Sequence, residues 1–184
     1  MNEENTKYLF EKYPKIFANK DKSMQESCMH WGFECGDGWY DLLNHACSLI
    51  QSHIDWNRTQ RARVLQFNRC LNRAINGDKA GLVWYYTYGN EPNEQTYKSV
   101  ENAIEQKRFQ AVPNKVVQVI ADQIKEKFGT LRFYYSGGDD FIRGVVSMAE
   151  SMSSVTCEEC GNLGERSSGG WIRTLCKTHR EQRE

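Results

Sequence analysis

The chain has 184 residues, of which 39% are hydrophobic and 12% aromatic, and this composition excludes an intrinsically disordered chain. Its 24 basic and 24 acidic side chains give a net charge of zero, which is not typical of a general polyanion-binding protein. The sequence contains neither an apolar run of the ~20 residues that cross a bilayer nor a secretory signal, so we expect a cytoplasmic protein with no membrane partner.

The N-terminal part is predicted to contain two helices of unequal length. Residues 6–18 indicate a short helix, and residues 19–36 are irregular. Asp37 stands where a capping side chain is needed. From Trp39 to His53 the apolar residues then recur with the 3.6-residue period of an amphipathic helix. We therefore expect this helix to begin at Asp37.

A further helix is predicted from Arg58 to Ile75, followed by helical stretches at 79–88 and 93–107. Residues 55–79 carry six basic and two acidic side chains, which is a net charge of +4. Arginines on one helix can contact phosphates, and they can equally form a solvated helix face. The candidate nucleic-acid-binding residues are Arg58, Arg61, Arg63, Arg69 and Arg73.

The segment 116–135 fits either a helix or a β-hairpin. A helical period runs as far as Phe128, whereas the aromatic, alternating residues after Gly129 favour the hairpin. The favoured hairpin has a type II′ turn at Gly129-Thr130 and pairs Phe128 with Leu131. One face then combines cations with an aromatic ring, which suits a nucleotide or a single strand but also an ordinary exposed sheet face. These candidate ligand-binding residues are Lys125, Lys127, Arg132 and Tyr134.

Two glycine-containing motifs precede predicted helices. Gly137-Gly138 indicate a turn, and Asp139 stands at the start of a helix that extends to Met152. The motif Cys35-Gly36-Asp37-Gly38-Trp39 is an unusual start for a helix. For this motif a helix cap with a buried Trp39 is favoured over an anion site at the helix N-terminus.

Residues 155–184 contain the clearest motif of the chain. Cys157-Glu-Glu-Cys160 and Cys176-Lys-Thr-His179 each place two metal ligands three positions apart, with fifteen residues between the pairs. Three thiolates and one imidazole complete a tetrahedron around one zinc ion, which is typical of a structural and not a catalytic site. Because so short a segment has little core, we expect the metal to supply most of its folding free energy, on the order of 10 kcal/mol.

Four further cysteines lack the spacing of metal ligands. Without a secretory signal, reduced thiols are expected, because disulfides form mainly in secreted proteins. A free cysteine away from a metal behaves as a small apolar residue. We therefore expect most of this group to be buried, namely Cys28, Cys35, Cys47 and Cys70.

These elements together predict an α+β fold. We expect a mostly helical N-terminal part, a short antiparallel hairpin and a C-terminal finger of the treble-clef or zinc-ribbon type. The corresponding domains are an α+β domain over residues 1–154 and a zinc finger over 155–184. The sequence shows no phosphate-cradling loop and no nucleophile–base pair, and it therefore favours a binding protein over an enzyme.

Several segments together resemble a family of small zinc-finger-containing proteins of tailed bacteriophages and prophages that have no assigned activity. The matching stretches cover residues 31–39, 61–78, 125–135 and 157–179. Many members of that family lack a region that corresponds to residues 55–112. The resemblance therefore implies that residues 55–112 are a helical insertion.

The resemblance also implies a function, because small phage proteins often bind and block a component of the host. We expect a non-enzymatic zinc-binding protein that binds a host protein or nucleic acid in the host cytoplasm and counters host defence. One alternative is a sponge that sequesters a small, cyclic nucleotide immune signal on the face of Lys125, Lys127, Arg132 and Tyr134. A second alternative is an enzyme that processes nucleotides or nucleic acid.

Overall fold

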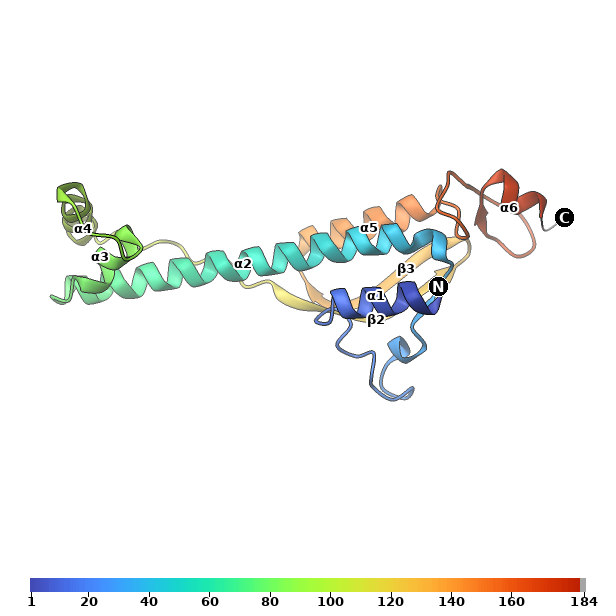
Figure 1. Cartoon of the computed structure of the whole chain (residues 1–184), viewed down its shortest axis with the longest axis horizontal. Coiled ribbons are helices and arrows are strands. Elements are labelled where there is room, and N and C mark those ends of the chain that lie inside the picture. The colour runs from blue at the N-terminus through green and yellow to red at the C-terminus, as the bar shows by residue number, and fades with distance from the viewer. Residues whose placement is uncertain (183–184) are drawn as a thin grey trace. The chain divides into compact units, whose positions relative to one another are not determined.

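The computed structural model describes residues 1–182, and the chain divides into two compact units (Figure 1). One unit consists of residues 1–55 and the chain from Val116 onward, and the other consists of residues 56–115. Helices and two small sheets make up the chain, so the predicted α+β class is confirmed. No helix within the described residues combines the length and the apolar character that crossing a membrane requires.

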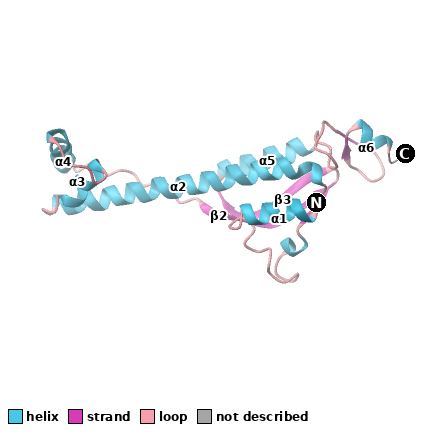
Figure 2. Ribbon diagram, viewed as in Figure 1, coloured by secondary structure: helices cyan, strands magenta, loops and turns pink. Residues whose placement is uncertain are grey.

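Figure 2 distinguishes the helices from the strands by colour. The helices are α1 (Glu3–Lys12), α2 (Tyr40–Ile75), α3 (Ala80–Thr87), α4 (Glu94–Gln106), α5 (Asp140–Ser153) and α6 (Lys177–Glu181). The strands are β1 (Phe33–Glu34), β2 (Val117–Lys127), β3 (Thr130–Gly138), β4 (Glu165–Arg166) and β5 (Thr174–Leu175). Two short 3-10 helices, η1 and η2, cover Cys28–Trp31 and Asp37–Trp39.

The core of the first unit lies between helices and the inner face of a three-stranded sheet. The strand order is β1-β2-β3, with β1 parallel to β2 and β2 antiparallel to β3. Alternating residues of the two long strands are buried, as one covered sheet face requires. The buried side chains that join the layers include Leu43 and Ile50 of α2, Ile124 of β2, Phe133 of β3 and Ile142 of α5.

The predicted β-hairpin is present, but its turn differs from the predicted one. Lys127 pairs with Thr130, so the turn residues are Phe128 and Gly129. Their φ angles, 53° and 77°, are both positive, which is the geometry of a type I′ and not a type II′ turn. The predicted pairing of Phe128 with Leu131 is therefore wrong. Because the register moves by two residues, the side chains of the two strands keep their predicted faces, whereas Phe128 lies in the turn and is exposed.

Helix α2 runs without a break through residues 54–57, where the sequence predicts the end of one helix and the start of another. The predicted cap is also wrong, because α2 begins at Tyr40, after the 3-10 helix η2. The carboxylate of Asp37 instead accepts hydrogen bonds at the start of α1, from the Asn2 nitrogen (2.8 Å) and the Asn5 amide (3.0 Å). Asn2 lies 35 positions away in sequence, so local sequence patterns could not indicate this contact.

The helix predicted after the glycine pair is confirmed. Gly137 and Gly138 both have a φ angle of 82°, and Asp139 caps α5 by accepting a hydrogen bond from the Ile142 nitrogen at 3.1 Å. The second carboxylate oxygen of Asp139 lies 2.8 Å from Nε2 of His53. Asp139 therefore links the start of α5 to the part of α2 that belongs to the first unit.

The second unit has a small core of its own. Phe67 and Leu71 of α2 pack with Leu82 of α3 and Val100 of α4. Within residues 56–115 all regular elements are helices. The apolar stripe predicted for the arginine-rich helix therefore packs against two shorter helices.

Candidate metal centre

Four potential metal ligands come together near the C-terminus, and they are the four residues of the predicted motif. The ligand atoms of Cys157, Cys160, Cys176 and His179 all lie within 4.8 Å of one another. His179 Nδ1 is 3.5 Å from the Cys157 sulfur and 3.2 Å from the Cys176 sulfur. The sulfurs of Cys160 and Cys176 are 3.8 Å apart. This arrangement can hold one metal ion.

The first ligand pair belongs to a tight turn that follows α5. The Gly161 nitrogen donates to the Cys157 oxygen at 2.9 Å, and Gly161 has a φ angle of 76° that favours glycine. The Cys157 nitrogen in turn donates to the Asn162 oxygen at 2.7 Å. The turn therefore has the backbone of a metal-binding knuckle.

The electrostatics of this turn favour a thiolate at Cys157. Burial raises the pKa of the Cys157 thiol, but hydrogen bonds from backbone N–H groups outweigh this effect and lower it to about 6. These N–H groups belong to Cys176, Cys160 and Glu159. Because the thiolate is the form that binds metals, the turn prepares this cysteine for coordination.

The second ligand pair lies at the start of α6. Strands β4 and β5 form a small antiparallel hairpin in which Glu165 pairs with Leu175, and β5 leads directly to Cys176. Cys176 is the N-cap residue of α6, and the Arg180 nitrogen donates to its carbonyl oxygen at 3.0 Å. One helical turn then carries His179 back to the cluster.

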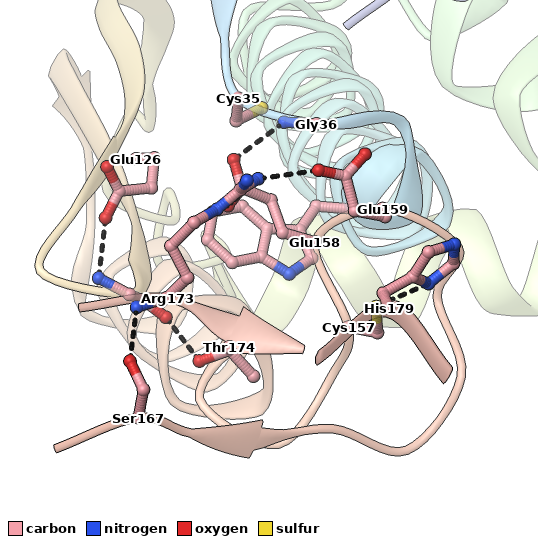
Figure 3. Close-up of polar contacts among 12 residues, drawn as sticks. Cys35, Gly36, Glu126, Cys157, Glu158, Glu159, Ser167, Arg173, Thr174 and His179 are labelled. Atoms are coloured by element: carbon pink, nitrogen blue, oxygen red, sulfur yellow. Dashed lines mark hydrogen bonds and ion pairs between the residues drawn. The ribbon is translucent and has the colours of Figure 1, made fainter. Parts of the chain in front are cut away.

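The knuckle packs against the start of α2, at the motif that contains two glycines (Figure 3). The Gly38 nitrogen donates to the Glu158 oxygen at 2.8 Å, and the Gly36 nitrogen donates to the Glu158 carboxylate at 3.1 Å. A Cβ atom on Gly38 would lie 2.7 Å from the Cys160 nitrogen and closer still to the Cys157 oxygen. No side chain fits at Gly38, which explains the glycines of this motif.

The sequence of this motif predicts a helix cap and a buried Trp39. Trp39 is fully buried, as predicted. Its indole nitrogen donates to the Thr156 oxygen at 2.8 Å, so the motif supports the metal-binding segment and not only α2. In the sequence, two glycines before a tryptophan indicate that another segment packs closely against this motif. They do not indicate which segment that is.

A buried ion pair fixes the knuckle to the β4–β5 hairpin (Figure 3). Glu158 is 5% exposed, and Arg173 donates to one of its carboxylate oxygens from Nε (3.0 Å) and Nη2 (2.9 Å). Arg173 Nη2 also contacts Glu159 at 2.8 Å. Burial lowers the pKa of Arg173, but the two carboxylates outweigh this effect and raise it. The guanidinium is therefore held in its charged form.

The same segment also contacts the turn of the β2–β3 hairpin. The Thr174 hydroxyl donates to the Gly129 oxygen at 2.6 Å, and Arg166 Nε donates to the Phe128 oxygen at 2.8 Å. Inside the turn, the Gly129 nitrogen donates to the Glu126 carboxylate at 2.5 Å. Both carbonyls of the turn are thus bound by the C-terminal segment.

The predicted ligand-binding face of the hairpin is present but is less cationic than expected. Lys125 lies opposite Arg132, and its Nζ atom is 5.6 Å from the centre of the Tyr134 ring. The Nζ atom of Lys127 lies over the ring of Phe128 instead, at 5.6 Å. Strand β1 adds to this face a carboxylate that the sequence did not predict.

That carboxylate belongs to Glu34, which pairs with Lys125 across the sheet. The Gln123 amide donates to the Glu34 carboxylate at 2.9 Å. Glu34 and Lys125 are far apart in sequence and β1 has only two residues, so no sequence signal pointed to this neighbour. A phosphate on this face would meet one acidic and two basic groups.

The five arginines of the predicted nucleic-acid-binding set have different environments. Arg61 donates to the Pro113 oxygen, and Arg73 forms an ion pair with Asp78 at 2.7 Å. Arg58 also has an interaction partner. Within residues 1–182, Arg63 and Arg69 form no hydrogen bond or ion pair, so these two are free to contact a phosphate.

The four cysteines outside the cluster differ in how far they are buried. Cys35 and Cys47 are buried, as predicted, and burial raises the pKa of Cys35 to about 12. Cys70 is half-buried. Cys28, in a short 3-10 helix, is exposed, so two of the four cysteines are buried and a third is half-buried, where most were expected to be buried.

The fold and this cluster define an α+β protein with a Cys3His group that can hold a metal ion. Comparison with known protein families, with curated protein sequences and with solved structures found no match.

Proposed function

We propose that the Cys3His cluster binds one zinc ion and that the C-terminal segment is a treble-clef finger. Three sulfurs and one imidazole nitrogen are a ligand set typical of structural zinc sites. The order of knuckle, β4–β5 hairpin and α6 favours a treble clef over a zinc ribbon. Four protein ligands leave no position for a substrate, so the ion has a structural role.

We further propose that the chain is a non-enzymatic protein that binds nucleic acid through residues 56–115. The observation that carries this proposal is the division of charge. Residues 56–115 contain ten basic and five acidic side chains, a net charge of +5, and the remaining residues carry −5. The net charge of the whole chain is zero because a basic unit and an acidic remainder cancel. The electrostatic field of the basic unit attracts polyanions.

The same unit exposes six large aromatic rings within its 60 residues. Exposed rings beside free cations are the combination that binds single strands, because bases stack on the rings while phosphates contact the cations. The free cations include Arg63 and Arg69 of α2. The exposed aromatic residues of this unit are Trp56, Trp84, Tyr86, Tyr88, Tyr97 and Phe109.

The biological setting is a separate part of the proposal. The resemblance of several segments to small phage proteins supports action in an infected bacterial cell, on host nucleic acid or on a host protein, against host defence.

Fluorescence anisotropy with a labelled single strand tests the nucleic-acid proposal. The affinity is expected to fall steeply between about 50 and 200 mM salt, because each neutralised phosphate releases counterions. Replacing Arg63 and Arg69 with Gln should lower the slope of log K against log salt by roughly 1.4. Lys7→Gln with Lys177→Gln removes two exposed charges from the other unit and should leave the slope unchanged. Absence of binding at low salt to any DNA or RNA strand would contradict the proposal.

A second candidate function is sequestration of a small nucleotide on the hairpin face. The observation that favours it is the Lys125 ammonium over the Tyr134 ring, beside Arg132. A thermal-shift screen against nucleotides tests it, since a ligand stabilises the folded state by mass action. Turnover of the stabilising nucleotide in that screen would indicate the enzyme alternative.

A further inference from the structure

The chain that returns from α4 is held along α2 by three side chains. The Asn57 amide donates to the Asn114 oxygen at 3.0 Å, and the Arg61 guanidinium donates to the Pro113 oxygen. Asn68 makes two hydrogen bonds of 2.9 Å with the backbone of Gln110, one from its amide nitrogen and one to its oxygen. Residues 107–115 are therefore an ordered strap and not a loose linker.

This strap forms one wall of a surface cavity within residues 56–115. Residues 108–111 of the strap line the cavity, together with Phe67 of α2, Tyr86 of α3 and four residues of α4, namely Ser99, Asn102, Ala103 and Gln106. Its volume of about 560 Å³ lies in the range of small-molecule sites. Phe67 is buried and provides an apolar floor, while the rings of Tyr86 and Phe109 remain 39% and 49% exposed.

The polar groups around this cavity are placed to recognise a base and a phosphate. The Gln106 amide donates to the Asn102 oxygen at 2.5 Å, which leaves the Asn102 amide as a donor and the Gln106 oxygen as an acceptor. Nucleobase edges combine a donor with an acceptor in the same way. Arg108 forms no hydrogen bond or ion pair within residues 1–182, so its guanidinium is free for a phosphate.

We propose that this cavity binds one nucleotide, with its base against the rings of Tyr86 and Phe109 and its phosphate on Arg108. The inference rests on the proposed nucleic-acid-binding function and assigns it a site and a ligand class. The shared chemistry is a base with an attached phosphate, which both a free nucleotide and a residue of a single strand provide. The hydrogen bonds of Asn68 fix the strap, so Phe109 and Arg108 are positioned before the ligand arrives.

The test compares variants inside and outside the cavity. Phe109→Ala removes a stacking ring, and Tyr8→Ala removes a similarly exposed ring of α1, in the other unit, that does not line the cavity. Arg108→Gln removes the free cation, and Lys98→Gln removes a cation that is paired with Glu94. The probes are a labelled single-stranded oligonucleotide of roughly 12 residues, its duplex, and nucleoside monophosphates.

Phe109→Ala is expected to weaken binding of the single strand about tenfold, since stacking of one base contributes roughly 1–3 kcal/mol. Phe109→Trp should retain binding, and Arg108→Gln should lower the salt slope by roughly 0.7. The control variants should bind within about twofold of the parent protein, and the duplex should bind more weakly because its bases are stacked internally. Binding of monophosphates at millimolar concentration or tighter, lost in Phe109→Ala, would identify the free nucleotide as a sufficient ligand.

Two results would overturn the inference, and they are distinguishable. If the parent protein binds the strand and the Phe109 and Arg108 variants bind it equally well, the site is wrong while the proposed function stands. If the parent protein binds neither the strand nor monophosphates at low salt, both are wrong. Circular dichroism of each variant verifies that residues 56–115 stay folded, which is expected because Phe109 and Arg108 are exposed.

Discussion

The indole nitrogen of Trp39 donates a hydrogen bond to the backbone oxygen of Thr156, 2.8 Å away and 117 positions later in the chain. Trp39 ends the 3-10 helix that leads into α2, and Thr156 directly precedes the first metal ligand. The metal-binding segment and the start of α2 are therefore one structural region. A substitution at the start of α2 is therefore expected to change the stability of the segment that contains the Cys3His cluster, and the reverse is expected as well.

The first prediction concerns the metal. The purified protein should contain one zinc ion per chain by elemental analysis, and Cys176→Ser should lose it. Without the ion, hydrogen exchange in residues 155–180 should accelerate by orders of magnitude, because coordination supplies most of the folding free energy of such a segment. Cys28→Ser changes an exposed cysteine outside the cluster and should leave both the metal content and the exchange unchanged. Protein prepared without chelator that contains no zinc would contradict the prediction.

The second prediction concerns the close packing of Gly38. Gly38→Ala should destabilise the first unit by about 3 kcal/mol or more, because the added methyl group overlaps backbone atoms that cannot move independently. Gly144→Ala is the matched control: Gly144 lies in α5 with open space around it, and the change should stabilise by ~0.5–1 kcal/mol. Chemical denaturation measures both. Equal stability of the two variants would contradict the close packing of Gly38 against the backbone of residues 157–161.

The third prediction separates the two faces of the hairpin. Phe133 is 3% exposed, and Phe133→Ala should cost ~3–5 kcal/mol by opening a cavity in the core. Tyr134 is 43% exposed, and Tyr134→Ala should change stability little. If the hairpin face binds a nucleotide, Tyr134→Ala alone should abolish the thermal shift that the nucleotide causes. A nucleotide that stabilises Tyr134→Ala as strongly as the parent protein would exclude this face as its site.

The fourth prediction concerns the pH dependence that Asp139 introduces. Burial raises the pKa of Asp139, but hydrogen bonds from His53 and from the Ile142 nitrogen outweigh it, so the pKa is lowered. A lowered folded-state pKa contributes stability above the unfolded value of about 3.9, and this stability is lost as the pH falls through the folded-state value.

Asp139→Asn keeps a capping oxygen for the Ile142 nitrogen and replaces the charged oxygen that faces His53 with a neutral NH2 group. This variant should therefore have a lower melting temperature than the parent protein at pH 7, and the difference should shrink as the pH falls below the unfolded value and disappear below the lowered folded-state pKa of Asp139. His53→Gln removes the ring that contacts the carboxylate and should reduce the effect of Asp139→Asn. A difference in melting temperature that persists unchanged in acid would assign the effect to packing and not to the charge.

Local patterns in the sequence predicted the elements whose causes are local. The ligand spacing around Cys157 and Cys176, the alternation in residues 131–135 and the capping position of Asp139 each act within a few positions of the chain. The structure has the corresponding knuckle, strand and helix start. These parts of the fold and the site could be read from the sequence alone.

Elements that depend on distant partners could not be predicted in this way. A turn at Phe128-Gly129 places a phenylalanine at a positive φ angle, which local preference disfavours. Contacts from Arg166 and Thr174 hold the carbonyls of this turn, and neither residue is near in sequence. The predictions for this turn and for Asp37 were wrong for the same reason. Each forms hydrogen bonds with residues more than thirty positions away in the sequence.

The division of the chain has a consequence for the order in which it folds during synthesis. Residues 56–115 are contiguous, so every contact of that unit is available once this stretch has left the ribosome. The first unit is discontinuous, and Trp39, Gly36 and the turn at Gly129 find their partners only after residues 156–174 have been made. The helical segments before residue 56 therefore keep apolar surface uncovered until the chain up to residue 174 has been made, so nascent-chain stages that end before Cys157 are the ones that require chaperone protection.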